Sequence, residues 1–180
     1  MIAGSLARRY ARALLDIGIA KNVYEQLGKD MDELGVLYSG SRDLTEALTN
    51  PVFPMVRRRA VLEAVIERAA VSPITRNFLL LLLDRERMPY VPAIARELRL
   101  MVDERAGRVR AVVTSATPLS SEHVASIQAA LEKASGKKVL IEKREDPNLL
   151  GGVVAKVGDV VYDGSVRTQL ETMRERFLAS

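Results

Sequence analysis

The sequence predicts an α + β protein in two parts: a six-helix bundle over residues 1–106 and a small mixed α/β domain over residues 107–180. Three observations predict this. Apolar residues recur three and four positions apart up to residue 106, a spacing typical of amphipathic helices. After Gly107 apolar and polar residues alternate, a pattern typical of strands. Residues 78–83 are all apolar, and because a membrane span needs about 20 apolar residues, this run predicts a helix covered by other protein on every side.

Helix breakers divide the first part into six segments. Ser39-Gly40-Ser41 ends the second helix, and Asn50-Pro51 ends the third because a residue before proline avoids the helical region. Ser5 is expected to cap the first helix, Pro54 and Pro73 suit the first turns of the fourth and fifth helices, and Met88-Pro89 is expected to close the fifth. The expected helices cover residues 5–20, 22–38, 43–48, 54–70, 73–87 and 92–106.

The first helix carries two apolar stripes. One holds Ala3, Ala7, Ala11, Leu15 and Ile19, and the other holds Leu6, Tyr10, Leu14 and Ile17. Two stripes indicate two neighbours, and the small alanines would allow a second helix to approach closely. An ordinary alanine-rich core helix explains the same pattern. The run at 78–83 likewise fits either the central helix of the bundle or a helix whose outer side a partner covers.

The second part alternates strands and helices. Residues 109–114 and 139–145 read as strands, with a helix from Ser120 to Gly136 between them. Residues 153–157 and 160–162 form a hairpin around Gly158-Asp159. Asp163-Gly164-Ser165 leads into a last helix, whose apolar stripe is Val166, Leu170, Met173 and Phe177.

Composition restricts the function. The absence of cysteine excludes disulfides, thiol nucleophiles and cysteine metal sites, and the single histidine cannot build a histidine metal site. The net charge of +4 is divided evenly, +2 in each part, so no concentrated basic patch supports nucleic-acid binding. A basic nucleic-acid-binding module nevertheless remains an alternative, because the pI is about 9.5. Arg8, Arg9 and Arg12 interrupt any signal-peptide core, so no secretion signal is expected.

No catalytic constellation emerges, so a small enzyme is the weakest alternative. Gly151-Gly152 precedes a strand and matches neither a P-loop nor a dinucleotide fingerprint, so these glycines predict a bulge or close backbone packing. Asp159 and Asp163 occupy turns, where aspartate is favoured locally. Ser165 is expected to cap the last helix, and Arg57-Arg58-Arg59 is interpreted as a solvated helix face. We expect no catalytic, cofactor or metal site.

The residues of the second part resemble a known family. Residues 146–152 (DPNLLGG), 157–159 (VGD) and 162–167 (YDGSVR) are similar to the signature of the delta subunit of the F-type ATP synthase. Its mitochondrial counterpart is the oligomycin sensitivity-conferring protein. Residues 7–14, Asn50-Pro51 with the basic triplet, 78–83 and 113–116 resemble further family segments in the same order. Asp84-Arg85, Pro89 and Pro92 depart from the usual pattern and leave the shape of the turn after the fifth helix open.

The resemblance implies a non-catalytic stator subunit that keeps the catalytic head from turning with the rotor during proton-driven ATP synthesis. It implies that residues 1–106 bind N-terminal helices of the alpha subunits and that residues 107–180 bind the b subunits of the peripheral stalk. No cofactor and no nucleic acid are implied, and the location is the cytoplasmic side of a bacterial inner or plasma membrane, reached only through the complex.

The resemblance also implies which residues carry these roles. The alpha-binding groove would lie between the first and fifth helices and use Ala3, Ala7, Tyr10, Ala11, Leu14, Leu15, Phe78, Leu79 and Leu82. The family signature would be structural and comprise Leu149, Gly151, Gly152, Gly158, Asp159, Asp163, Gly164 and Ser165.

Overall fold

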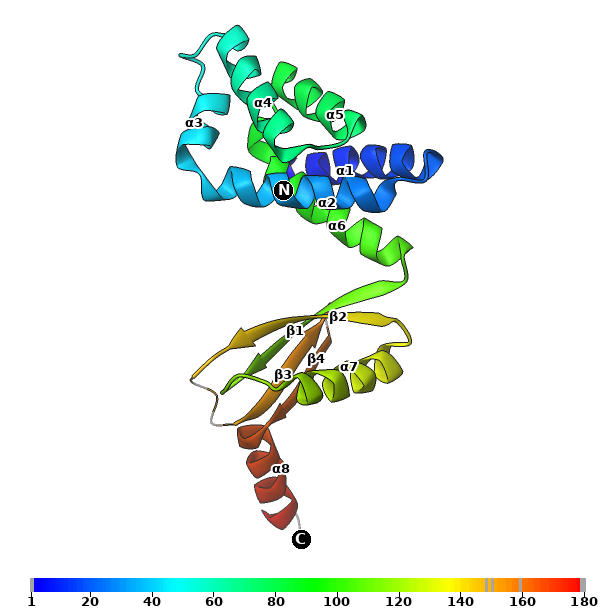
Figure 1. Ribbon diagram of the computed structural model, residues 1–180. Helices are drawn as coiled ribbons and strands as arrows, with labels where there is room; N and C mark the ends of the chain where they lie inside the picture. The colour runs from blue at the N-terminus through cyan, green and yellow to red at the C-terminus, as the bar shows by residue number, and fades with distance from the viewer. Residues whose placement is uncertain (1, 148, 150, 159, 179–180) are drawn as a thin grey trace. The chain divides into compact units, whose positions relative to one another are not determined.

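The structure is a computed structural model that describes residues 2–147, 149, 151–158 and 160–178, with side chains described for all of these except residues 2–3, 169, 172 and 175–178. The chain divides into two units, Met1–Val102 and Asp103–Ser180, each with its own hydrophobic core (Figure 1). The fold is helix-rich and contains one mixed sheet of four strands, so the α + β class expected from the sequence is confirmed.

The helices that precede the first strand follow the predicted breaks closely. They are α1 (Ile2–Ala20), α2 (Tyr24–Gly40), α3 (Arg42–Thr49), α4 (Met55–Ala69), α5 (Pro73–Asp84), the short 3-10 helix η1 (Met88–Tyr90) and α6 (Val91–Arg105). Ser72 begins α5, because its hydroxyl oxygen accepts a hydrogen bond from the N–H of Thr75 at 3.2 Å. Pro89 does not simply close α5 but lies inside η1, which separates α5 from α6.

The core of the first unit draws on every one of these elements. On α1, Ala7, Ala11 and Leu14 are buried together with Gly18, because positions four and three apart share one narrow sector of a helix. The two stripes expected on this helix are therefore one buried stripe, flanked by the half-buried Leu6, Tyr10 and Leu15, whereas Ile17 and Ile19 at the ends of the expected stripes are exposed.

Three local expectations for this unit were wrong. The first helix begins at Ile2, so Ser5 lies within it and is not its cap. The apolar spacing predicts that Leu37 on α2 and Val61 on α4 belong to the inward stripes of their helices, but both are exposed, because each lies to one side of its helix's buried stripe. Arg58 is buried although the basic triplet was interpreted as a solvated face; its position on α4 is one turn before Leu62, which belongs to the core.

The second unit is a sheet in the order β2-β1-β3-β4. Its elements are β1 (Arg108–Ser115), α7 (Ser121–Ser135), β2 (Lys138–Glu145), β3 (Gly152–Val157), β4 (Val160–Ser165) and α8 (Val166–Leu178). β1 and β2 are parallel and connected by the crossover helix α7, whereas β3 pairs antiparallel with both β1 and β4. Leu131 of α7 packs with residues of β1, β2 and β3 to form the small core.

The last helix contributes little to that core. Figure 1 shows α8 leaving the end of β4, away from α7. Val166, Leu170 and Met173, which form its apolar stripe, are exposed, and none of its described side chains belongs to the core cluster. Phe177, the fourth residue of the stripe, lies outside the described side chains.

Candidate functional site

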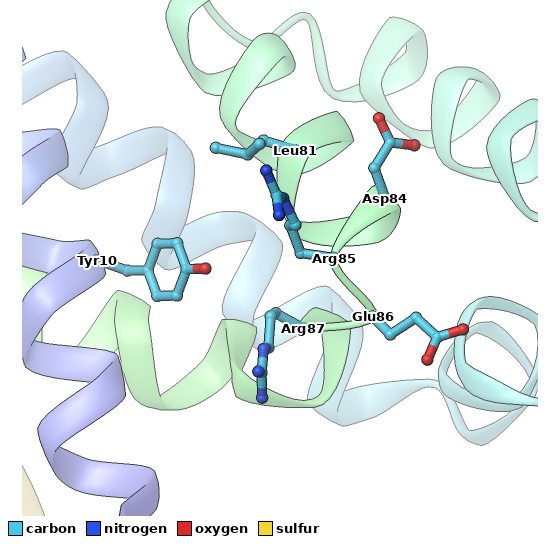
Figure 2. A pocket seen from close by; sticks show the side chains of 6 residues that line it. All are labelled: Tyr10, Leu81, Asp84, Arg85, Glu86 and Arg87. Atoms are coloured by element: carbon cyan, nitrogen blue, oxygen red, sulfur yellow. The ribbon is translucent and has the colours of Figure 1, made fainter.

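A hollow of about 640 Å³ opens between α1 and the turn that follows α5. Its walls are Tyr10, Leu81, Asp84, Arg85, Glu86 and Arg87 (Figure 2). Tyr10 extends from α1 on one side, and the other five residues come from the last turn of α5 and the connection to η1. The hollow therefore lies between the two helices on which the sequence predicted a partner-binding groove.

The apolar part of the hollow consists of Tyr10 and Leu81. The ring of Tyr10 meets the ring of Phe78 edge to face, with centroids 6.1 Å apart and an angle of 68° between the planes. This contact holds the half-buried Tyr10 at the border of the core. Across the hollow, Leu81 leaves 46% of its surface exposed, although its neighbours Leu79, Leu82 and Leu83 are buried. An exposed leucine beside a tyrosine is a surface that an apolar partner can cover.

The structure places most of the predicted groove residues in the core. Those that are buried are Ala7, Ala11, Leu14, Phe78, Leu79 and Leu82. All six belong to the hydrophobic core of the first unit, and none of them lines the hollow. Tyr10 and Leu15 are half-buried, and the side chain of Ala3 lies outside the described residues.

Sequence reasoning missed Leu81, Arg85 and Arg87. The sequence did contain a signal for the exposure of Leu81. Asn77 stands four positions before Leu81, and Asp84 and Arg85 stand three and four positions after it. Residues at those spacings share a helix face, and all three are exposed. Leu81 therefore belongs to the polar side of an otherwise apolar run.

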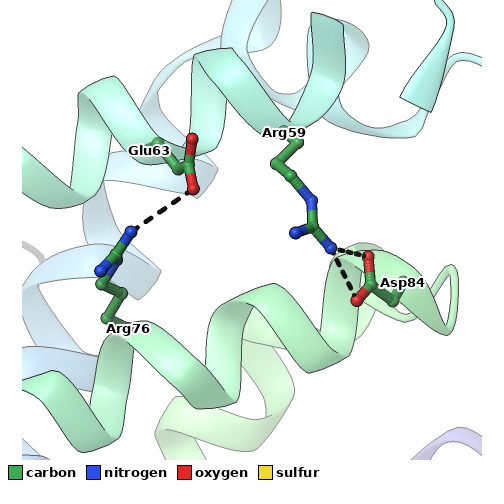
Figure 3. Close-up of polar contacts among 4 residues, drawn as sticks. All are labelled: Arg59, Glu63, Arg76 and Asp84. Atoms are coloured by element: carbon green, nitrogen blue, oxygen red, sulfur yellow. Dashed lines mark hydrogen bonds and ion pairs between the residues drawn. The ribbon is translucent and has the colours of Figure 1, made fainter. Parts of the chain in front are cut away.

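Two ion pairs connect α4 to α5 (Figure 3), and one of them holds Asp84, a residue that lines the hollow. The Arg59 guanidinium donates to both carboxylate oxygens of Asp84, at 2.7 and 2.9 Å, and Arg76 lies 3.4 Å from Glu63. The hydrogen bond and charge of Asp84 raise the pKa of Arg59. Exposed pairs of this kind add little stability, but the pair with Arg59 directs the Asp84 carboxylate toward α4.

The signature residues of the second unit support the backbone where β3, β4 and α8 meet. Ser165 caps α8, since its hydroxyl oxygen accepts a hydrogen bond from the N–H of Thr168 at 3.3 Å. The Asp163 carboxylate accepts from the N–H of Ser165 at 2.8 Å and from the hydroxyl of Thr168 at 2.9 Å. These bonds, led by the one from the Ser165 backbone, lower the pKa of Asp163.

The other signature residues are placed nearby. The N–H of Leu149 donates to the carbonyl of Asp146, and the carbonyl of Gly151 accepts from the N–H of Val166. Gly152 pairs with Ser165 and Gly164 with Val153 in the β3–β4 ladder, and Gly158 follows β3. Asp159 lies outside the described residues.

Exposed apolar side chains also lie on β4 and α8 of this unit, and we call these residues the β4–α8 surface; Val161 points to the face of the sheet opposite to Val160 and Tyr162. The β4–α8 surface consists of Val160, Val161, Tyr162, Val166, Leu170 and Met173. β4 is an edge strand of the sheet, and an apolar edge strand followed by an uncovered apolar helix is typical of a protein-binding surface.

Among the described residues no group of three or more His, Asp or Glu side chains is arranged to hold a metal ion. A helix long and apolar enough to cross a membrane is likewise not found in the described part of the chain.

Comparisons with known proteins agree on one family. The sequence model of the ATP synthase delta (OSCP) subunit family matches residues 6–177. The chain is 39% identical over 175 residues to ATP synthase subunit delta of Geobacter metallireducens, covering 97% of both chains. It is 44% identical to the same protein of Anaeromyxobacter sp. strain Fw109-5, covering 98% of both, and 43% identical to that of Myxococcus xanthus, covering 97% of both.

The fold is also similar to a solved structure. A chain of the Toxoplasma gondii mitochondrial ATP synthase hexamer superposes with a TM-score of 0.68 at 24% identity, covering 97% of this chain and 98% of that one. At this identity the likeness concerns the fold.

Proposed function

The chain belongs to the ATP synthase delta (OSCP) subunit family, and from this we propose that it joins two specific partners within that complex. It is a structural part of ATP synthase and not a catalytic one. As a stator part it links the catalytic head to the peripheral stalk. In our proposal the six-helix part, residues 1–106, binds N-terminal helices of the alpha subunits, and residues 107–180 bind the b subunits.

The observation that carries the alpha-subunit proposal is the hollow between α1 and α5. Leu81 is exposed there beside Tyr10, in the region where the family resemblance expects a helix of the alpha subunit. An amphipathic helix laid against these two side chains would remove their apolar surface from water, which is the usual driving force of helix-in-groove recognition. The buried groove residues, from Ala7 and Ala11 to Leu79 and Leu82, would hold α1 and α5 at the spacing that this helix requires.

Titration of a synthetic peptide from the N-terminus of the alpha subunit against the full chain tests this role. Leu81→Glu should weaken binding about tenfold or more, because the partner would have to bury a charge. Leu37→Glu is the matched control, since Leu37 is also 46% exposed but lies on α2, outside the hollow. Glutamate at Ala11 or Leu82 would disturb the core instead, because both are fully buried. Saturable binding that Leu81→Glu leaves unchanged would contradict this site.

The observation that supports the stalk proposal is the β4–α8 surface. An uncovered edge strand and helix stripe suit the end of a helical stalk, whose apolar side chains could cover them. Leu170→Glu should reduce the capture, by the full chain, of a fragment from the C-terminus of the b polypeptide. Leu140→Glu is the control on β2, at the opposite edge of the sheet. Equal losses in both variants would contradict a specific role for the β4–α8 surface.

Association with both partners would place the chain at the cytoplasmic side of a bacterial membrane, held there only through the complex. Attachment of one chain at two sites adds avidity, so each contact can be modest by itself. Purification of the tagged full chain from its own cells tests the whole proposal: the proteins of the head and stalk should be recovered together with it. Recovery of nucleic acid instead would favour the alternative of a basic nucleic-acid-binding module.

A further inference from the structure

Four charged residues line the hollow, and the acidic and the basic side chains among them point in different directions. They are Asp84, Arg85, Glu86 and Arg87. Asp84 is held by Arg59 of α4 at 2.7 Å, and the nearest cationic partner of Glu86 is Arg58 of α4, at 3.8 Å. Figure 2 shows both carboxylates directed away from Tyr10. The two acidic groups of the hollow are therefore oriented toward the arginines of α4 and are not available to neutralise a cation in the hollow.

Arg85 and Arg87 differ from the two acidic residues. Within the described residues neither guanidinium makes an ion pair with a carboxylate. Arg87 lies 5.9 Å from the centre of the Tyr90 ring, a cation–π contact that orients the side chain but leaves its positive charge in place. In Figure 2 both side chains extend from the turn on the side of Tyr10. In the described part of the chain the hollow thus presents two uncompensated cations beside the apolar pair Tyr10 and Leu81.

From this charge arrangement we infer that the segment bound in the hollow carries a carboxylate that pairs with Arg85 and Arg87. The inference rests on the proposed function and commits to one occupant: the N-terminal segment of the alpha subunit, as an amphipathic helix. Its apolar face covers Leu81 and Tyr10, and an Asp or Glu side chain at the border of that face meets the two guanidinium groups. Arginine suits this role because its planar donors match a carboxylate in two-point geometry.

The expected contribution is selectivity more than raw affinity. Pairs at the border of an interface stay partly solvated, so each is weak, but a complementary charge fixes the register of the bound helix and speeds its association. Apolar contact with Leu81 alone would accept many amphipathic helices. The two arginines would select those that place an acidic residue beside the turn after α5.

The test uses the full chain and two synthetic peptides. One is the N-terminal segment of the alpha polypeptide from the same ATP synthase, and the other is this peptide with each Asp and Glu changed to Asn and Gln. Arg85→Gln and Arg87→Gln, singly and together, are compared with Arg57→Gln, an exposed arginine of α4 that does not line the hollow. Calorimetric titration at two salt concentrations measures each dissociation constant.

Each single variant should weaken binding of the acidic peptide about two- to fivefold, the range of an exposed ion pair. The wild-type chain should bind the amide peptide more weakly than the acidic one. The double variant should no longer distinguish the peptides and should lose most of its salt dependence. Arg57→Gln should behave as wild type. If Arg87→Gln disturbs the fold through the Tyr90 contact, the result for Arg85→Gln alone tests the carboxylate inference. Arg85 is exposed, so its substitution should leave the fold intact.

Two failures can be told apart. Equal binding of both peptides by the wild-type chain, or wild-type affinity in the double variant, would overturn the carboxylate inference while the alpha-subunit site stands. No binding of either peptide by the wild-type chain would refute the alpha-subunit site and the inference with it.

Discussion

Gly152 and Ser165 pair across β3 and β4 so closely that a methyl group on Gly152 would lie 2.9 Å from the Cα atom of Ser165 and closer still to the carbonyl oxygen of Gly164. Gly152 also has a φ of +81°, a conformation that residues with a side chain rarely adopt. Two independent constraints therefore require glycine here, and neither involves a ligand. Of the two alternatives expected for Gly151-Gly152, a bulge or close backbone packing, Gly152 shows close backbone packing, whereas a Cβ on Gly151 would meet only the side chain of Val166.

Gly152→Ala should lower the free energy of unfolding of the second unit by about 2–4 kcal/mol, because β3 and β4 would have to separate. Urea denaturation followed by circular dichroism measures this. Gly136→Ala is the control, since Gly136 has a similar φ of +67° but open space around the position of a Cβ. It should cost only about 1–2 kcal/mol, the penalty of the left-handed conformation. Equal costs would show that close packing is not the constraint.

Asp163 should make the stability of the second unit depend on pH. Its pKa is lowered in the folded chain, mainly by the hydrogen bond from the backbone N–H of Ser165. The stabilisation is therefore fully present above the unfolded pKa of about 3.9 and is lost as the pH falls through the lower folded pKa.

Urea titrations between pH 6 and pH 2.5 can isolate this contribution. The difference in unfolding free energy between the wild-type chain and Asp163→Asn should shrink as the pH falls across that window. Glu145→Gln serves as control, because it also removes one exposed carboxylate from this unit. If the difference in unfolding free energy between the wild-type chain and Asp163→Asn stays constant down to pH 2.5, the lowered pKa of Asp163 does not stabilise this unit.

Asp30 joins α2 to the start of α5 through buried hydrogen bonds. Its Oδ2 accepts from the N–H of Ser72 at 2.9 Å and from the hydroxyl of Thr75 at 2.8 Å, and its Oδ1 accepts from Gln26 at 2.7 Å. Asp30→Ala should lower the stability of the first unit by about 2–4 kcal/mol, because the buried hydroxyl of Thr75 and the half-buried N–H of Ser72 lose their acceptor. Thermal and urea unfolding measure the loss. Glu33→Ala, on the exposed side of α2, should stay within about 0.5 kcal/mol of wild type.

Arg58 is a buried cation with weak compensation. Its Nε has no hydrogen-bond partner among the described residues, and its nearest carboxylate, Glu86, is 3.8 Å away and itself mostly exposed. Because burial of a poorly paired charge is costly, Arg58→Met should leave the free energy of unfolding unchanged or raise it by up to about 2 kcal/mol. Arg58→Ala should lower it by about 1–3 kcal/mol, because the aliphatic stem no longer fills its space. A large loss in the methionine variant would show that the charge itself stabilises the unit.

Much of this protein was predictable from its sequence. The period of the apolar residues changes at Gly107, and Pro and Gly mark the ends of the elements, so the α + β class and nearly all helices and strands follow from local rules. The β3–β4–α8 signature is equally local, because a cap, a hairpin and a close strand pair need only nearby residues. The exceptions are η1, where Pro89 was expected to end a helix, and the start of α1.

Only the tertiary structure decided which side of each helix is covered. The six apolar residues at 78–83 do not by themselves show which side of the helix is covered, because every angular position is apolar. Only the polar residues that flank the run, Asn77, Asp84 and Arg85, indicate that Leu81 faces solvent. The fold buries Phe78, Leu79, Leu82 and Leu83 in the core of the first unit and leaves Leu81 exposed in the hollow between α1 and the end of α5. The pairing of charges also depends on the tertiary structure. Asp84 and Arg85 are adjacent in sequence, but Asp84 pairs with Arg59 of α4, whereas Arg85 has no carboxylate partner among the described residues.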